Sequence, residues 1–257
     1  MTSTPEGLPG GAWIAGAPVG ILAIRTSHAL IPGNVQHAGS FDLPVLYGCV
    51  DVPAGCSLTR GDAALTPLII DAAHRLVDQG VGAIVGACGS FAHYQRPVSD
   101  ALAVPAFLSI MVQVPFLLAG LPAGRKLCII AAWASALTDT LYDQCGITDR
   151  DRLVITQMAG QPAFDAMLAP GGRLLVADLR REVLAVARAA LAADPTIAAF
   201  LLQCSDLPPF APDLAAATGL PVFDMAGLVR WLQAALLPPA RGGFRHSPPE
   251  ARSCQPN

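Results

Sequence analysis

Several residue types that common enzyme chemistry needs are scarce in this chain of 257 residues. Lys126 is the only lysine, so a mechanism that forms a Schiff base would depend on that side chain alone. Glutamate occurs only as Glu6, Glu182 and Glu250. The net charge is −3, and the 16 basic residues are scattered singly, which gives no electrostatic footprint for nucleic acid or an anionic membrane. We therefore expect neither of these as a partner.

The spacings that bind metals, cofactors or disulfides are also missing. No C-x-x-C or H-x-x-x-H pair occurs, and no glycine-rich phosphate loop follows a strand-like segment. The cysteines are odd in number and irregularly spaced, which argues against a disulfide framework. We predict that the chain uses no metal and no cofactor. The cysteines are Cys49, Cys56, Cys88, Cys128, Cys145, Cys204 and Cys254.

The longest stretch without a charged residue, from Ala101 to Gly124, is long enough to span a bilayer. It contains Pro105, Pro115 and Pro122, which would break a spanning helix, so we interpret it as a buried strand followed by a short helix. The N-terminal apolar stretch has no basic region before it, unlike a secretory signal. We expect a cytoplasmic protein.

Strand-like apolar runs alternate with helix-like segments along the chain, which is typical of parallel β-α-β units. Residues 66–79 repeat apolar side chains at helical spacing and end at Gly80. The pattern predicts an α/β fold with doubly wound sheets. The predicted strands are 19–25, 44–50, 81–87, 104–110, 126–131, 153–156, 197–203 and 221–224, and the other predicted helices are 138–144, 180–193 and 226–236.

Two segments of the chain resemble each other. Cys88 ends the apolar run in V-G-A-I-V-G-A-C-G-S, and Cys204 ends the run in I-A-A-F-L-L-Q-C-S-D. Each cysteine precedes by 17 residues a proline, Pro105 or Pro221, that opens the next apolar strand. We infer two similar α/β halves, each of which presents one thiol at the carboxyl end of a strand.

Two such thiols suit acid–base chemistry at carbon. Ligands of parallel α/β sheets bind outside the carboxyl ends of the strands, where the start of a helix is expected to lower the pKa of a cysteine. One thiolate would remove a proton from one face of a substrate, and the other thiol would return a proton to the opposite face. Gly89, Ser90 and Ser205 stand where donors to the developing negative charge belong.

These residues carry a family resemblance. The segments G-A-C-G-S-F, V-P-A-F-L-S-I-M-V-Q-V-P, L-L-Q-C-S-D-L-P-P-F-A-P and G-L-P-V-F-D, together with I-L-A-I-R-T-S-H-A-L-I-P-G-N-V, resemble the aspartate/glutamate racemase superfamily. Hydantoin racemases, arylmalonate decarboxylases and maleate isomerases are among its members. The resemblance covers roughly residues 19–237. It implies two pseudo-symmetric domains with the site in the cleft between them, and Cys88 and Cys204 as the acid/base pair.

The resemblance also implies the domain limits. Residues 18–117 would form a first α/β domain, completed by residues 220–238, and residues 118–219 would form the second. Composition predicts a loose N-terminal arm over residues 1–17 and a disordered tail over residues 239–257. The sequence does not set the oligomeric state, and a homodimer is left open.

The chain departs from the family pattern beside both cysteines. Amino-acid racemases usually follow the first cysteine with Asn-Thr and the second with Thr, whereas this chain has Gly89-Ser90 and Ser205-Asp206. The first change removes donors that would hold an amino acid, which argues against aspartate or glutamate as substrate. Trp133 falls where the decarboxylases have a tyrosine, so it would narrow the pocket or donate its indole N–H.

The remaining candidates are residues near the predicted strand ends. We expect Arg25, Thr26, Tyr47, Phe91 and Asp206 to line the cleft. The other expectations are that His93 lies on the surface, that Ser109 caps a helix with Gln113 four residues on, that Cys56 is exposed, and that Cys49, Cys128 and Cys145 are inert core thiols.

The sequence thus predicts a cofactor-independent racemase or epimerase that acts on a small carboxylate-bearing substrate through Cys88 and Cys204. Two other enzyme types stay open, a decarboxylase that relies on Cys204 and a cis–trans isomerase in which a cysteine adds to the substrate. A third alternative is a binding protein of the same fold without catalytic activity.

Overall fold

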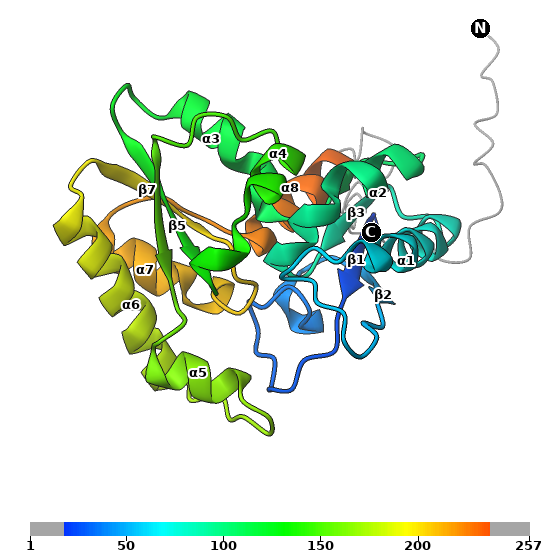
Figure 1. Cartoon of the computed structure of the whole chain (residues 1–257), viewed down its shortest axis with the longest axis horizontal. Coiled ribbons are helices and arrows are strands. Elements are labelled where there is room, and N and C mark those ends of the chain that lie inside the picture. The colour runs from blue at the N-terminus through cyan, green and yellow to red at the C-terminus, as the bar shows by residue number, and fades with distance from the viewer. Residues whose placement is uncertain (1–17, 237–257) are drawn as a thin grey trace, which may run out of the picture.

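A computed structural model describes residues 18–236 of the chain. Two lobes stand side by side in Figure 1, and each contains one four-stranded parallel sheet. The fold class expected from the sequence is confirmed. The predicted N-terminal arm lies outside the described residues, as does the predicted tail with Cys254.

The first sheet has the strand order β2-β1-β3-β4. Its central strands are apolar on both faces, as β1 and β3 are fully buried. Gly20 of β1 pairs with Leu46 of β2 on one side and with Ile84 of β3 on the other. The strands are β1 (Val19–Ala23), β2 (Leu46–Cys49), β3 (Ala83–Gly86) and β4 (Ala106–Phe107).

The second sheet repeats this arrangement with the order β6-β5-β7-β8. The two sheets therefore match strand for strand, so the similarity between the halves that the sequence indicated extends to their topology. The strands are β5 (Lys126–Ala131), β6 (Leu153–Gln157), β7 (Ile197–Leu202) and β8 (Val222–Phe223). Each predicted strand is present, and most are one to five residues shorter than predicted.

Helices cover both sheets and connect successive strands. The predicted helices over 66–79, 138–144, 180–193 and 226–236 are confirmed, and the structure adds α2, α5 and α7, which were not predicted. The helices are α1 (Thr66–Asp78), α2 (Gln95–Ala101), α3 (Val114–Gly120), α4 (Asp139–Gln144), α5 (Pro162–Leu168), α6 (Val176–Ala193), α7 (Ala211–Thr218) and α8 (Met225–Leu236).

Two helices cross between the lobes. Helix α3 follows β4 of the first sheet but packs against β5 of the second, and α8 follows β8 of the second sheet but packs against β1 of the first. The Gln233 side-chain amide of α8 also donates to the Leu43 carbonyl of the first lobe. Strand β8 thus belongs to the second sheet, and the chain returns to the first lobe only at α8, slightly later than the predicted boundary at residue 220.

One apolar core continues from lobe to lobe. It contains buried residues of β1, β3, β5 and β7 together with residues of α3 and α8. The charge-free stretch from Ala101 to Gly124 supplies β4 and α3 to this arrangement, as expected. Within residues 18–236, no helix combines the length and the apolarity that crossing a bilayer requires.

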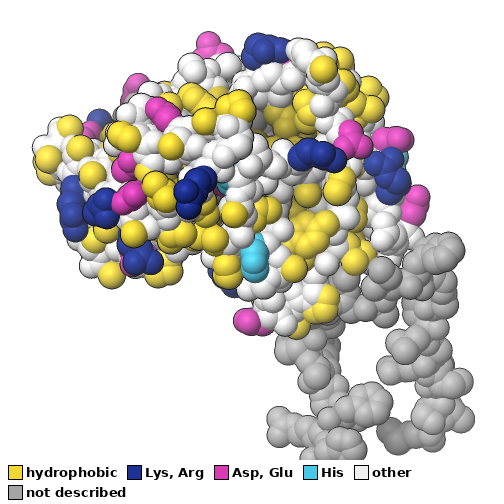
Figure 2. All heavy atoms as spheres, turned by 90° about the horizontal axis from the view of Figure 1, so that it is seen from below, with side chains coloured by type: hydrophobic (Ala, Val, Ile, Leu, Met, Phe, Trp, Pro, Cys, Tyr) yellow, Lys and Arg dark blue, Asp and Glu magenta, His cyan; other side chains and the backbone are white. Residues whose placement is uncertain are grey.

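Charged side chains lie on the outside of both lobes. Figure 2 shows basic and acidic side chains mixed on one face, with hydrophobic side chains between them.

Candidate active site

A cavity of about 270 Å³ lies where the carboxyl ends of the two sheets meet. The segments that line it follow β1, β2 and β3 in the first lobe and β5 and β7 in the second. This is the position at which parallel α/β sheets bind ligands. The lining residues are 24–28, 30, 34, 36, 57–59, 88–90, 132–133, 136 and 203–206, joined by Phe164 and Leu168 of α5.

Both predicted cysteines line this cavity. Cys88 follows β3 by two residues and Cys204 follows β7 by two residues, so the thiols occupy matching positions in the two halves. Cys88 is half-buried, and only 7% of Cys204 is exposed.

The loops that carry Cys88 and Cys204 (the two cysteine loops) touch through Gly89. A methyl group built on Gly89 would lie 2.3 Å from both the carbonyl oxygen and the side-chain nitrogen of Gln203, the residue before Cys204. Only a glycine allows this approach, which brings both loops against one cavity. The sequence placed Gly89 at the site as a donor, and the structure adds this steric requirement.

Burial governs the acidity of both thiols. It raises the pKa of Cys88, although the backbone and hydroxyl of Ser90 act in the opposite direction. Burial also raises the pKa of Cys204 well above its usual value, and the carboxylate of Asp206 adds to this. The expectation of lowered pKa values is thus wrong, because removing the thiolates from water costs more free energy than the neighbouring donors supply.

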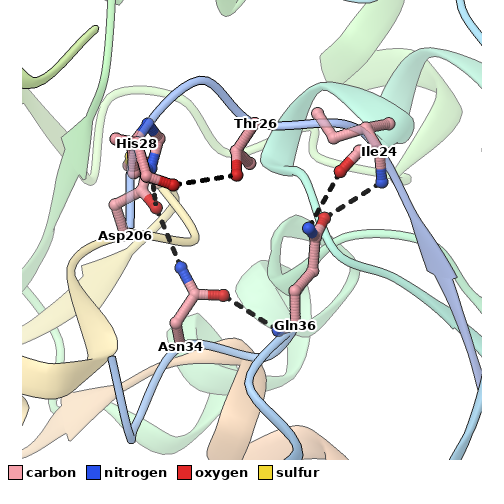
Figure 3. Close-up of polar contacts among 7 residues, drawn as sticks. Ile24, Thr26, His28, Asn34, Gln36 and Asp206 are labelled. Carbon is pink, nitrogen blue, oxygen red and sulfur yellow. Dashed lines mark hydrogen bonds and ion pairs between the residues drawn. The ribbon is translucent and has the colours of Figure 1, made fainter. Parts of the chain in front are cut away.

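Asp206 is the centre of a polar cluster that joins the two lobes (Figure 3). Its Oδ1 atom lies 3.0 Å from His28 Nε2 and accepts a hydrogen bond from Asn34 Nδ2 at 2.8 Å. Its Oδ2 atom lies 3.9 Å from the sulfur of Cys204, which is within the range for a thiol donor. His28 and Asn34 belong to the loop after β1, so the cluster fastens that loop to the second lobe.

A second set of contacts fixes Asn34. Its Oδ1 accepts from the backbone N–H of Gln36, and the side chain of Gln36 makes two hydrogen bonds with the backbone of Ile24, directly after β1. Sequence reasoning selected Arg25 and Thr26 from this loop but missed His28 and Asn34. The only available signal was the polar run R-T-S-H directly after a buried strand.

Seven of the nine residues predicted to bind substrate line the cavity. The structure does not place the other two there. The Phe91 side chain is fully buried in the core of the first lobe, and Tyr47 packs against the core with its hydroxyl donating to the Val35 carbonyl at 3.2 Å. The residues in the lining are Arg25, Thr26, Gly89, Ser90, Trp133, Ser205 and Asp206.

Trp133 stands at the rim of the cavity with 40% of its surface exposed. Its ring meets Phe164 of α5 edge-on, with the ring centroids 6.3 Å apart. The two aromatic side chains thus form one part of the cavity wall, and the bulk of Trp133 narrows the cavity as the sequence suggested.

Other sequence expectations had mixed outcomes. Ser109 caps a short 3-10 helix by accepting from the Met111 N–H, as predicted, and Cys128 and Cys145 are buried.

His93 is buried rather than on the surface, because it packs against Gly61 of a loop that covers it. Cys49 is exposed rather than in the core, because β2 is an edge strand that ends there, and Cys56 is partly buried.

Comparison with known proteins places the fold among enzymes. No family model matches the chain. The chain is 29% identical over 242 residues to dimethylsulfoniopropionate lyase 3 of Emiliania huxleyi. This alignment covers 89% of the chain and 62% of the relative. A dimethylsulfoniopropionate lyase of Durusdinium is also 29% identical, over 215 residues that cover 81% of the chain and 71% of the relative. The chain thus spans about 62% of the length of the Emiliania protein.

Solved structures share the two-lobed fold at lower sequence identity. A liganded mutant of arylmalonate decarboxylase has a TM-score of 0.57 at 17% identity, with 89% of this chain and 94% of that chain covered. Glutamate racemase from Francisella tularensis with D-glutamate has a TM-score of 0.52 at 19% identity, with coverage of 87% and 82%. Allantoin racemase from Pseudomonas fluorescens has a TM-score of 0.53 at 14% identity, with coverage of 84% and 90%. The chain therefore has the fold of these racemases and this decarboxylase, as the resemblance implied.

Proposed function

We propose that this chain is a cofactor-independent lyase that removes a proton from the carbon next to a carboxylate and expels a dialkyl sulfide from the neighbouring carbon. The observation that carries this proposal is a cavity lined by two thiols and by the aromatic pair Trp133–Phe164. The sequence relatives named dimethylsulfoniopropionate lyase support this choice of substrate class.

A cysteine thiolate begins the reaction by taking the α-proton. The electron pair of the broken C–H bond forms the new carbon–carbon double bond, and the C–S bond breaks with its electrons going to sulfur. Dimethylsulfoniopropionate then yields dimethyl sulfide, acrylate and a thiol that carries the proton. The sulfide leaves as a neutral molecule and needs no acid.

The remaining lining suits the two ends of such a substrate. Ser90 and Ser205, with the backbone N–H groups beside them, supply donors for the carboxylate, whose negative charge grows as the proton leaves. A sulfonium group is a weakly hydrated cation with apolar methyl groups, which aromatic faces attract. Trp133 and Phe164 place aromatic rings at the rim and wall of the same cavity.

The first test measures dimethyl sulfide released from dimethylsulfoniopropionate by gas chromatography, for the wild type and for Cys88→Ala and Cys204→Ala. Loss of the general base lowers kcat about 10²–10⁴-fold, so at least one variant falls by that amount. Cys49→Ala is the matched control, because Cys49 is exposed and lies outside the cavity lining. Equal rates in all four proteins contradict a thiol mechanism, and no release by the wild type contradicts the lyase assignment.

The racemase or epimerase predicted from the sequence is the second candidate. It is favoured by the two thiols at matching strand ends, because inversion needs an acid and a base whereas the elimination needs one base. Proton–deuterium exchange at carbon, followed by NMR on both enantiomers of amino acids, hydantoins and arylmalonates, tests it. Exchange with loss of optical rotation that either cysteine variant abolishes would establish inversion. Release of carbon dioxide that survives Cys88→Ala would instead indicate a decarboxylase.

A further inference from the structure

The polar cluster around Asp206 couples one of the two thiols to a histidine of the other lobe. The carboxylate has Cys204 on one oxygen and His28 on the other, and the chain positions of Asp206 and His28 differ by 178 residues. Asp206 and His28 both line the cavity. A change of charge on either of them therefore acts where substrate would bind.

Water screens these charges weakly. Only 5% of the His28 side chain and 14% of the Asp206 side chain are exposed. The charged or titratable groups that face the cluster are Cys204 in contact, Cys88 through space, and Arg25, which lines the same cavity from an exposed position. Because partly buried charges are screened much less than surface ones, a charge on His28 or Asp206 acts strongly on the neighbouring Cys204 thiol.

His28 has a free position for a second proton. Its Nε2 atom faces Asp206, whereas its Nδ1 atom is buried without a hydrogen-bond partner in the described part of the chain. Buried side-chain nitrogens nearly always have a partner, so a structural role alone leaves this one unexplained. The hydrogen bond with Asp206 raises the pKa of His28, and burial opposes this shift. Nδ1 can gain a proton while the Nε2 contact stays in place.

We propose that His28 is a positioning residue that controls, through Asp206, whether Cys204 can become a thiolate. When His28 carries a proton, its positive charge balances the Asp206 carboxylate, and a thiolate forms beside a neutral pair. When His28 is neutral, the thiolate forms beside an unbalanced negative charge, which disfavours it. The importance of this control for turnover rests on the lyase function proposed above, but the control itself is measurable without substrate.

The experiment measures alkylation of Cys204 by iodoacetamide across a pH series, with peptide mass spectrometry on the full chain. Only the thiolate reacts, so the rate at each pH reports the fraction of Cys204 that is ionised. His28→Gln removes the balancing charge and is expected to slow alkylation about tenfold at pH values at which His28 is protonated in the wild type, and to leave the rate unchanged at higher pH. Asp206→Asn removes the carboxylate and is expected to speed alkylation at the higher pH values.

The double variant provides the decisive comparison. Without the carboxylate, nothing offsets the lowering of the His28 pKa by burial, so His28 is neutral and His28→Gln is expected to leave the alkylation rate unchanged in the Asp206→Asn background. Cys88, measured in the same digests, is an internal reference whose alkylation rate is expected to change less, because Ser90 rather than Asp206 contacts it. Asn34→Ala is the matched control, since it removes a neutral donor to the same Asp206 oxygen but no charge.

The outcomes separate this proposal from the lyase function. Rate changes of the same sign for His28→Gln and Asp206→Asn, or a slowing by Asn34→Ala equal to that by His28→Gln, would overturn the control by charge. Thermal melts exclude unfolded variants. Rate changes of opposite sign without turnover of dimethylsulfoniopropionate would support the coupling and reject the lyase. Turnover by a wild type whose Cys204 is insensitive to His28 would retain the lyase and reject the coupling.

Discussion

At the scale of single residues, the site depends on small features that the sequence conceals. The strand-end positions of Cys88 and Cys204 could be predicted, because apolar runs and their end points are visible in the sequence. The partners of Asp206 could not, because His28 and Asn34 are distant in the chain and meet it only after the lobes pack. Phe91 and Tyr47 were misplaced because sequence proximity to the site does not say which way a side chain points.

Gly89 gives a prediction at this scale. The added methyl group of Gly89→Ala would overlap the Gln203 backbone, so we expect the two cysteine loops to separate, at a cost of about 1–3 kcal/mol in the free energy of unfolding. Urea denaturation measures the cost. Gly120→Ala is the control, because a methyl group there meets nothing within 4 Å. Equal stability of both variants would mean that the loops adjust freely.

At the scale of secondary structure, periodicity predicted the buried strands and the long amphipathic helices. It said little about α3 and α8 crossing between the lobes, because a helix pattern shows that one face is buried but not which sheet buries it. The crossing at α3 depends on Arg152, which follows α4 and precedes β6. Its guanidinium donates to the backbone carbonyls of Leu118, Leu121, Pro122 and Arg125.

We expect Arg152→Lys to weaken this crossing, because an ammonium group cannot reach four carbonyls at once. Leaving such acceptors unpaired costs about 1–3 kcal/mol in the free energy of unfolding, which urea denaturation would show. In Arg181→Lys, by contrast, an exposed ion pair with Asp178 is altered, and a change below about 0.5 kcal/mol is expected. Similar losses in both variants would show that the carbonyl contacts contribute nothing specific.

At the scale of the whole molecule, the shared core joins both lobes into one folding unit. Ile21 of the first sheet and Ile129 of the second belong to the same buried cluster, which α3 and α8 complete. The sequence predicted two domains, and its repeated pattern correctly indicated two similar halves. It did not show that their cores are continuous, since that depends on contacts between lobes.

A single unfolding transition is therefore expected. Trp133 reports on the second lobe, and Trp231 on α8 reports on the first. Both test proteins carry Trp13→Phe. Adding Trp231→Phe leaves Trp133 as the single tryptophan, and adding Trp133→Phe leaves Trp231. The two urea curves, followed by fluorescence, should have the same midpoint. Two separate midpoints would show that the lobes unfold independently despite the common core.

The matched sheets also bear on whether the two ends of the cavity differ. Two identical half-chains related by a perfect two-fold axis would surround a ligand with equivalent thiols, and neither end of a small molecule would have a preferred direction. In this chain Cys88 is followed by Gly89-Ser90 and Cys204 by Ser205-Asp206. The nearly repeated scaffold therefore encloses a directional space, in which a molecule with a negative and a positive end has one best orientation.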